Sequence, residues 1–163
     1  MSVTKLWVLR HGDAEEPGLG PDAERELTEL GRDEARAAGA ALAALSVKPD
    51  IVLASPRVRA QQTAMLATAE LETGFETHLP LSGGFGAQDA LSVLAGRAGQ
   101  TVVLVGHMPD LAIVVRDLSG ANVALRTGGL ALLRGSGAAF ELAVLLRPRE
   151  SRAIIGEDAS QTT

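Results

Sequence analysis

The chain of 163 residues has no cysteine, no tyrosine and few other aromatic residues. The lack of cysteine excludes disulfides, thiolate chemistry and zinc sites with cysteine ligands. With one tryptophan and three phenylalanines, the core must be mainly aliphatic, and binding of nucleic-acid bases by aromatic stacking is disfavoured. The net charge of −5 also argues against general affinity for nucleic acid.

Long apolar segments are missing as well. No apolar run approaches the ~20 residues that a membrane-spanning helix needs. The first residues lack the basic region and long apolar stretch of a signal peptide. We therefore expect a cytoplasmic protein that binds neither membranes nor nucleic acid.

Short apolar runs alternate with segments of helical periodicity along most of the chain. Strands are predicted at 5–9, 51–54, 77–81 and 101–105, helices at 31–45 (with Thr28 as N-cap), 55–71, 89–98 and 109–118, and a terminal hairpin at 129–134 and 140–147 with its turn at 135–137. This order predicts an α/β three-layer sandwich, with a mostly parallel central sheet and helices on both faces. We expect one domain over residues 1–150 and a polar, frayed C-terminal tail over residues 151–163.

Three of the predicted strands end in side chains that can bind phosphate. Arg10 and His11 follow the first strand, Arg59 lies just beyond the second, and His107 follows the strand at 101–105. If these strands are neighbours in a parallel sheet, their carboxyl ends share one edge and the four side chains converge there. Arginines can clamp phosphoryl oxygens while an imidazole attacks phosphorus in line.

Four motifs together resemble the signatures of the histidine phosphatase superfamily. They are Arg10-His11-Gly12, Leu27-Thr28-x-x-Gly31, Ser55-x-x-x-Arg59-Ala60-x-x-Thr63 and Gly106-His107. The resemblance covers roughly residues 3–147. The short length and the Arg-His-Gly-Asp-Ala start are most similar to the small single-domain phosphohistidine phosphatases.

The resemblance implies a phosphoglycerate mutase-like fold and assigns roles to the motif residues. His11 would be the nucleophile that is transiently phosphorylated. Arg10, Arg59 and His107 would bind the phosphoryl group, with His107 protonated or donating a hydrogen bond at the transition state. Gly12 and Asp13, which follow the nucleophile, are candidate substrate-binding residues. No cofactor is implied, and because the histidine spacing matches no zinc pattern we expect no metal.

One departure from the family concerns the general acid. Larger relatives carry a glutamate in the loop after the third strand, whereas residues 79–88 of this chain contain no acid. An alkoxide leaving group needs a proton donor, but an imidazole can be protonated on its other nitrogen and departs readily. Asp13, Glu15 and Asp89 remain candidate donors, although Asp89 is expected to cap a helix. The missing glutamate therefore favours substrates with a P–N bond.

We accordingly expect a phosphatase that acts on phosphohistidine in a signalling protein. The alternatives are a phosphomonoesterase for a small metabolite and a phosphate-binding module without catalysis. Arg57 is expected at the rim of the site, and His78 at the surface or the sheet edge. Gly83, Gly84 and Gly86 are expected to form a flexible rim rather than a phosphate loop.

Overall fold

One six-stranded sheet forms the centre of the computed structural model, which describes residues 2–157. Its strands are β1 (Thr4–Arg10), β2 (Ile51–Ala54), β3 (Glu76–Thr77), β4 (Thr101–Gly106), β5 (Leu130–Ser136) and β6 (Ala139–Leu146). They lie in the order β3-β2-β4-β1-β5-β6. Strands β1 to β4 pair in parallel, and β5 and β6 add an antiparallel hairpin along β1. The predicted mostly parallel sheet is confirmed.

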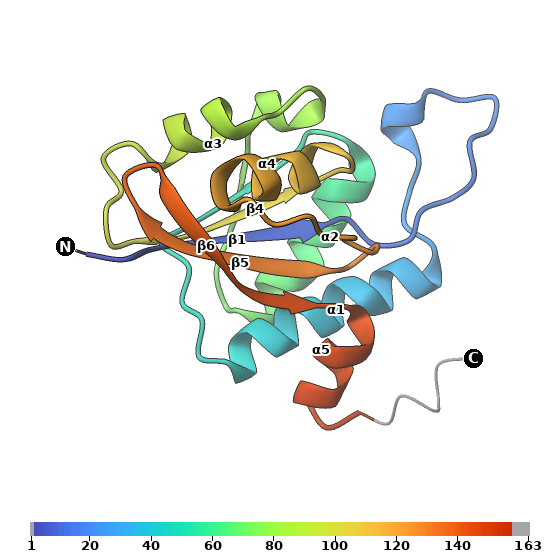
Figure 1. Ribbon diagram of the computed structural model, residues 1–163. Helices are drawn as coiled ribbons and strands as arrows, with labels where there is room; N and C mark the ends of the chain where they lie inside the picture. Colours follow the sequence, from blue (N-terminus) through green and yellow to red (C-terminus); the bar gives the residue numbers. More distant parts are fainter. Residues whose placement is uncertain (1, 158–163) are drawn as a thin grey trace.

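Helices cover both faces of this sheet (Figure 1). The α-helices are α1 (Glu29–Ala44), α2 (Val58–Glu70), α3 (Ala87–Leu94), α4 (Asp110–Ser119) and α5 (Pro148–Ile154), and two short 3-10 helices are η1 (Asp22–Glu24) and η2 (Leu79–Ser82). Helices α1, α2 and α5 lie on one face, and α3 and α4 lie on the other (Figure 1). The three-layer sandwich predicted from the order of elements is therefore confirmed.

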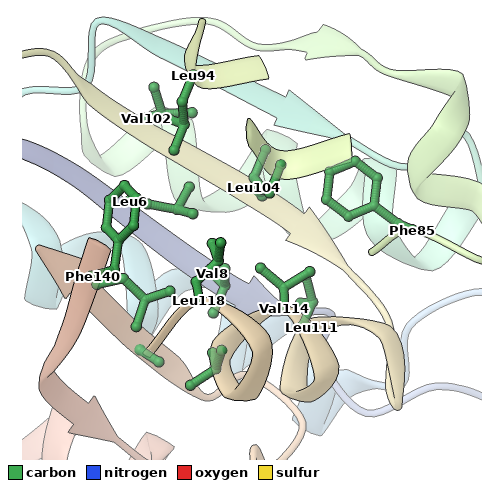
Figure 2. Close-up of a cluster of buried hydrophobic side chains, with 14 of the residues drawn as sticks. Leu6, Val8, Phe85, Leu94, Val102, Leu104, Leu111, Val114, Leu118 and Phe140 are labelled. Atoms are coloured by element: carbon green, nitrogen blue, oxygen red, sulfur yellow. The ribbon is translucent and has the colours of Figure 1, made fainter. Parts of the chain in front are cut away.

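The aliphatic core has two halves because side chains alternate along each strand. Leu6 and Val8 of β1 pack toward α3 and α4, whereas Trp7 and Leu9 pack toward α1 and α2. Figure 2 shows the first half, in which side chains of β1 and β4 meet those of α4. Since the central parallel strands are buried on both faces, their sequences are almost continuously apolar.

The two long helices begin in different ways. The Thr28 hydroxyl accepts a hydrogen bond from the Gly31 N–H at 3.0 Å, so Thr28 is the predicted N-cap of α1. The prediction that Ser55 caps α2 is wrong, because the N-cap is Arg57 and the helix begins at Val58. The Ser55 N–H instead continues the sheet by donating to Val105 O at 3.0 Å.

Two shorter elements also differ from prediction. The strand expected at 77–81 is limited to Glu76–Thr77, and residues 79–82 form η2, which contains Pro80. Proline cannot donate to a strand ladder, which favours the turn over the strand. Strand β5 extends through Ser136, so the hairpin turn consists of residues 137–138 rather than 135–137.

The predicted frayed tail is wrong for its first residues. Residues 151–154 belong to α5, which packs against α1. Ser151 and Arg152 are buried there, although their polarity suggested solvent. Residues 158–163 of the predicted tail lie outside the described residues. Within residues 2–157, no helix has the length and hydropathy to cross a membrane.

Candidate active site

The site is built where β1, β4 and β2 end side by side. Arg10 pairs with Gly106 in the sheet register. The ladder then continues past the strand ends, because the His11 N–H donates to Gly106 O and the Ser55 N–H donates to Val105 O, each at 3.0 Å. The loop between β1 and α1 stands at this edge (Figure 1). The sequence motifs that follow the three strands therefore meet at one place.

His11 is held in the tautomer that a nucleophile needs. Its Nδ1 lies 2.7 Å from the carbonyl oxygen of Gly12, which can only accept, so Nδ1 carries the ring proton and Nε2 keeps its lone pair. Burial, with the added effect of the Arg59 and Arg10 charges, lowers the pKa of His11 to about 4, although the Gly12 carbonyl opposes the shift. The ring is thus neutral at pH 7, and a neutral imidazole is a competent nucleophile.

Two glycines let the nucleophile turn pack directly on helix α1. A Cβ on Gly12 would lie 2.3 Å from Gly31 O, and a Cβ on Gly31 would lie 1.9 Å from Asp13 O. The Gly12 N–H also donates to the Thr63 hydroxyl at 3.0 Å, and that hydroxyl donates to Arg59 O at 2.7 Å. These contacts give a physical reason for the spacing of the glycine and threonine motifs.

His107 lies across from the nucleophile, with 5.2 Å between the two ring centroids. Its Nε2 is 2.7 Å from the Ser55 hydroxyl, which also accepts the Arg57 N–H at 3.2 Å. Burial first, and then His11, lower the pKa of His107 to about 3, so the ring is neutral in the ligand-free protein. Of the two forms expected for His107, the protonated one therefore requires a bound anion to favour it, whereas a neutral ring can still donate one hydrogen bond.

Both motif arginines, Arg10 and Arg59, use some of their N–H groups in hydrogen bonds within the protein. Arg10 donates through Nη1 to Leu125 O at 3.0 Å. Arg59 donates through Nη1 to Asp22 O at 2.9 Å and through Nη2 to the Asp22 carboxylate at 3.2 Å. Burial lowers the pKa of both guanidinium groups from their ordinary value, and each retains unused N–H groups.

Three buried polar atoms in the site have no hydrogen-bond partner among the described residues. They are Arg10 Nε, Arg59 Nε and His107 Nδ1. Buried polar groups are nearly always satisfied in native proteins, so an unpartnered group calls for an explanation. Two cationic donors and an imidazole nitrogen left open together are what an anionic phosphoryl group requires.

Asp22 and Arg25, in the loop between β1 and α1, are two site residues that were not predicted from the sequence. The Asp22 carboxylate forms ion pairs with Arg25 at 2.9 Å, Arg57 at 2.5 Å and Arg59 at 3.2 Å. Arg25 also contributes to lowering the pKa of His11, which places its charge near the nucleophile. No local pattern marked either residue, because each is one of several charged residues in this loop.

Glu34 was also missed, although the sequence held a signal for it. It is a carboxylate at 7% exposure on the apolar face of α1, in helical spacing with Gly31, Ala35 and Ala38. Its Oε1 accepts the Asp13 N–H at 2.8 Å, and its Oε2 accepts the Thr127 hydroxyl at 3.2 Å. Burial raises its pKa from the ordinary value. Glu34 therefore fixes the turn that follows the nucleophile.

The three candidate proton donors are all engaged in structural hydrogen bonds. Asp13 accepts the Thr28 hydroxyl at 2.7 Å, Glu15 accepts the Glu26 N–H at 2.9 Å, and Asp89 accepts the Gly86 N–H at 2.8 Å. Asp89 thus caps α3, as expected. Asp13 borders the nucleophile, but its carboxylate is directed to Thr28, so its part in substrate binding stays a prediction.

The remaining predicted residues lie around the mouth of the site or beside it. Arg57 donates through Nε to Ser82 O at 2.7 Å, which joins it to the glycine-containing segment. Gly83 lies next to this side chain, because a Cβ at this position would be 4.0 Å from Arg57 Nη2. His78 is half-buried and packs edge-on against Phe85. Across residues 2–157, no group of three or more potential metal ligands is gathered.

Comparison with known proteins identifies the family. The model of the histidine phosphatase superfamily (branch 1) matches residues 6–82. An uncharacterized protein of Picosynechococcus sp. is 33% identical over 144 residues, which span 83% of this chain and 87% of that protein. The chain belongs to the histidine phosphatase superfamily. Membership supports a phosphatase of the hydrolase class.

Solved structures share this fold over nearly the whole chain. The protein histidine phosphatase SixA complexed with tungstate has a TM-score of 0.79 and 21% identity, covering 90% of this chain and 98% of that one. A protein assigned as SixA from Nakamurella multipartitia has a TM-score of 0.75 and 26% identity, covering 91% and 98%. A protein assigned as an α-ribazole-5′-phosphate phosphatase from Escherichia coli has a TM-score of 0.73 and 18% identity, covering 89% and 97%. The fold is therefore shared by phosphatases named for protein and for metabolite substrates.

Proposed function

We propose that this protein is a metal-independent phosphatase that hydrolyses phosphohistidine on a protein through a phosphorylated His11. The observation that carries the proposal is the set of unpartnered buried atoms Arg10 Nε, Arg59 Nε and His107 Nδ1 beside a neutral His11. A phosphoryl group would accept hydrogen bonds from the arginines and His107. Catalysis of phosphoryl transfer rests mainly on such positioning and charge stabilisation.

In the first step, His11 Nε2 attacks phosphorus and forms a P–N bond while the bond to the leaving group breaks. The leaving imidazole of the substrate is protonated on its other nitrogen and departs as a neutral ring. The phosphorylated His11 becomes cationic, and the Gly12 carbonyl oxygen, 2.7 Å from Nδ1, stabilises that charge. Water then attacks phosphorus, releasing inorganic phosphate and regenerating neutral His11.

Ser55 would set the tautomer of His107 in this reaction. Its hydroxyl already accepts the Arg57 N–H and can donate its own proton to His107 Nε2. Nδ1 then carries the ring proton and is the open donor toward the phosphoryl oxygens. A phosphoryl dianion also favours the charged imidazolium, which strengthens that hydrogen bond.

Preference for a P–N bond is supported by the engagement of Asp13, Glu15 and Asp89 in structural contacts. Asp22 is a poor proton donor as well, because the hydrogen bond from Arg25, followed by the charge of Arg59, lowers the pKa of its carboxyl. Two structures with this fold are named as phosphatases of phosphohistidine, which also supports the preference for a P–N bond. A phosphomonoesterase for a small metabolite is the second candidate, since a structure named for α-ribazole-5′-phosphate shares the fold.

The test compares kcat/KM on a phosphohistidine protein, an aryl phosphate and a primary alkyl phosphate. We expect clear activity on the first two and a rate ~10²–10⁴-fold lower on the third, the usual contribution of one general acid. His11→Ala should abolish all three activities while the circular dichroism spectrum is unchanged. Equal efficiency on the alkyl phosphate would remove the preference, and an alkyl-specific loss in Asp13→Asn, Glu15→Gln or Asp89→Asn would identify an acid.

A further inference from the structure

The segment at residues 16–24 is tied to the rest of the protein through one residue, Asp22, by its carboxylate and its main-chain carbonyl. Its tip is exposed, as at Leu19. Among the described residues, the hydrogen bonds that join this segment to elements outside the loop are those of Asp22 with Arg57 and Arg59. The base of the loop is fixed separately by a bridge between Ala14 and Leu27. Whether the tip is docked on α2 therefore depends on Asp22.

Asp22 occupies donors that a phosphoryl group would use. Its carboxylate and carbonyl oxygens take Arg59 Nη1 and Nη2, and the carboxylate also contacts Arg57 Nη1 and Arg25. The Asp22 side chain is 52% exposed, whereas that of Arg59 is only 7% exposed. The exposed Asp22 carboxylate of the loop thus contacts the buried Arg59 of the site. The carboxyl is ionised at neutral pH, and the neighbouring arginines, Arg25 most strongly, lower its pKa from the ordinary value.

We propose that Asp22 is an internal anion of the site, which holds Arg57 and Arg59 when the site is empty and releases them when a phosphoryl group binds. The inference rests on the proposed function because it requires the phosphoryl group to enter this arginine cluster. A phosphoryl group carries nearly two charges at neutral pH and offers three acceptor oxygens, so it can displace a single carboxylate.

Because Asp22 is part of the same chain, it competes with a phosphoryl group for Arg57 and Arg59 at a high effective concentration. This competition weakens the apparent affinity for phosphate, including the phosphate formed as product. The return of Asp22 to the arginines then assists product release. A second consequence is structural, since the exchange frees residues 16–24 from α2.

The test measures binding of inorganic phosphate by isothermal titration calorimetry, which needs no turnover. Asp22→Asn and Asp22→Ala should each bind phosphate about two- to fivefold more tightly than the wild type, the range that corresponds to an ion pair with a solvent-exposed carboxylate. Asp33→Asn is the matched control, because Asp33 forms an exposed ion pair with Arg36 on α1. It should leave the affinity unchanged.

Hydrogen exchange of residues 16–24 gives a second readout. Phosphate should speed exchange in the wild type. The increase should be smaller in Asp22→Ala, which lacks the carboxylate contacts and keeps only the bond from Arg59 to the main-chain carbonyl of residue 22. Unchanged or weaker phosphate binding in both Asp22 variants would overturn the proposal and show that Asp22 only positions the arginines. A protein that binds phosphate as expected but does not hydrolyse phosphohistidine would instead refute only the proposed substrate.

Discussion

Acid should destabilise the ligand-free protein through its two site histidines. The pKa is about 4 for His11 and about 3 for His107 in the folded chain, against an ordinary value of 6.5 for both. Below pH 6.5 the unfolded chain therefore binds more protons than the folded chain, and the free energy of unfolding falls as the pH falls. Well above pH 6.5 the rings are neutral in both states, so neither histidine contributes to pH dependence there.

The size of the effect follows from the distance to the ordinary pKa. At pH 5, which lies about 1.5 units below that value, each ring should lower the free energy of unfolding by about 2 kcal/mol relative to pH 7. Both rings remain neutral in the folded state at pH 5, so the two losses add to about 4 kcal/mol. Such a loss is a large part of the ~5–15 kcal/mol that stabilises a typical domain.

Urea unfolding at pH 7 and pH 5, followed by circular dichroism, measures this loss. His11→Gln and His107→Gln should each recover about 2 kcal/mol of the difference between the two pH values. His78→Gln, which changes the third histidine outside the site, is the control for loss of an imidazole as such. Comparing each variant with itself removes the direct cost of the substitution. If all four proteins lose the same free energy between pH 7 and pH 5, the reasoning from buried neutral rings is wrong.

Three further outcomes are expected for the catalytic reaction. Arg59→Lys should lower kcat/KM on an aryl phosphate by about 10- to 100-fold, because lysine keeps the charge but lacks the planar fork; wild-type efficiency would place Arg59 outside the site. Ser55→Ala should lower kcat about five- to tenfold through loss of one hydrogen bond to His107, and steady-state kinetics that show a change confined to KM would contradict that role. Dialysis against a chelator should leave turnover unchanged, whereas loss of activity and its return with a divalent ion would count against a metal-independent mechanism.

Local sequence determined the elements and the chemistry that they carry. The apolar runs at β1, β2 and β4 predicted their strands because central parallel strands are buried on both faces. Residue type and position predicted the motif residues: Arg10, His11 and His107 lie at or directly after strand ends, and Arg59 lies in the first turn of the helix that follows β2. A parallel sheet then brings such ends to one edge by geometry alone, and the structure does bring these four side chains together.

Tertiary contacts decided what no short window of sequence contains. Ser55 looks like a helix cap, yet pairing with β4 keeps it in the sheet and directs its hydroxyl to His107. The tail looks polar, yet Ser151 and Arg152 are buried because α5 packs against α1. Asp22 meets Arg57 and Arg59 across more than thirty residues of sequence. Each of these contacts depends on which distant elements become neighbours, so its energy exists only once the chain has folded.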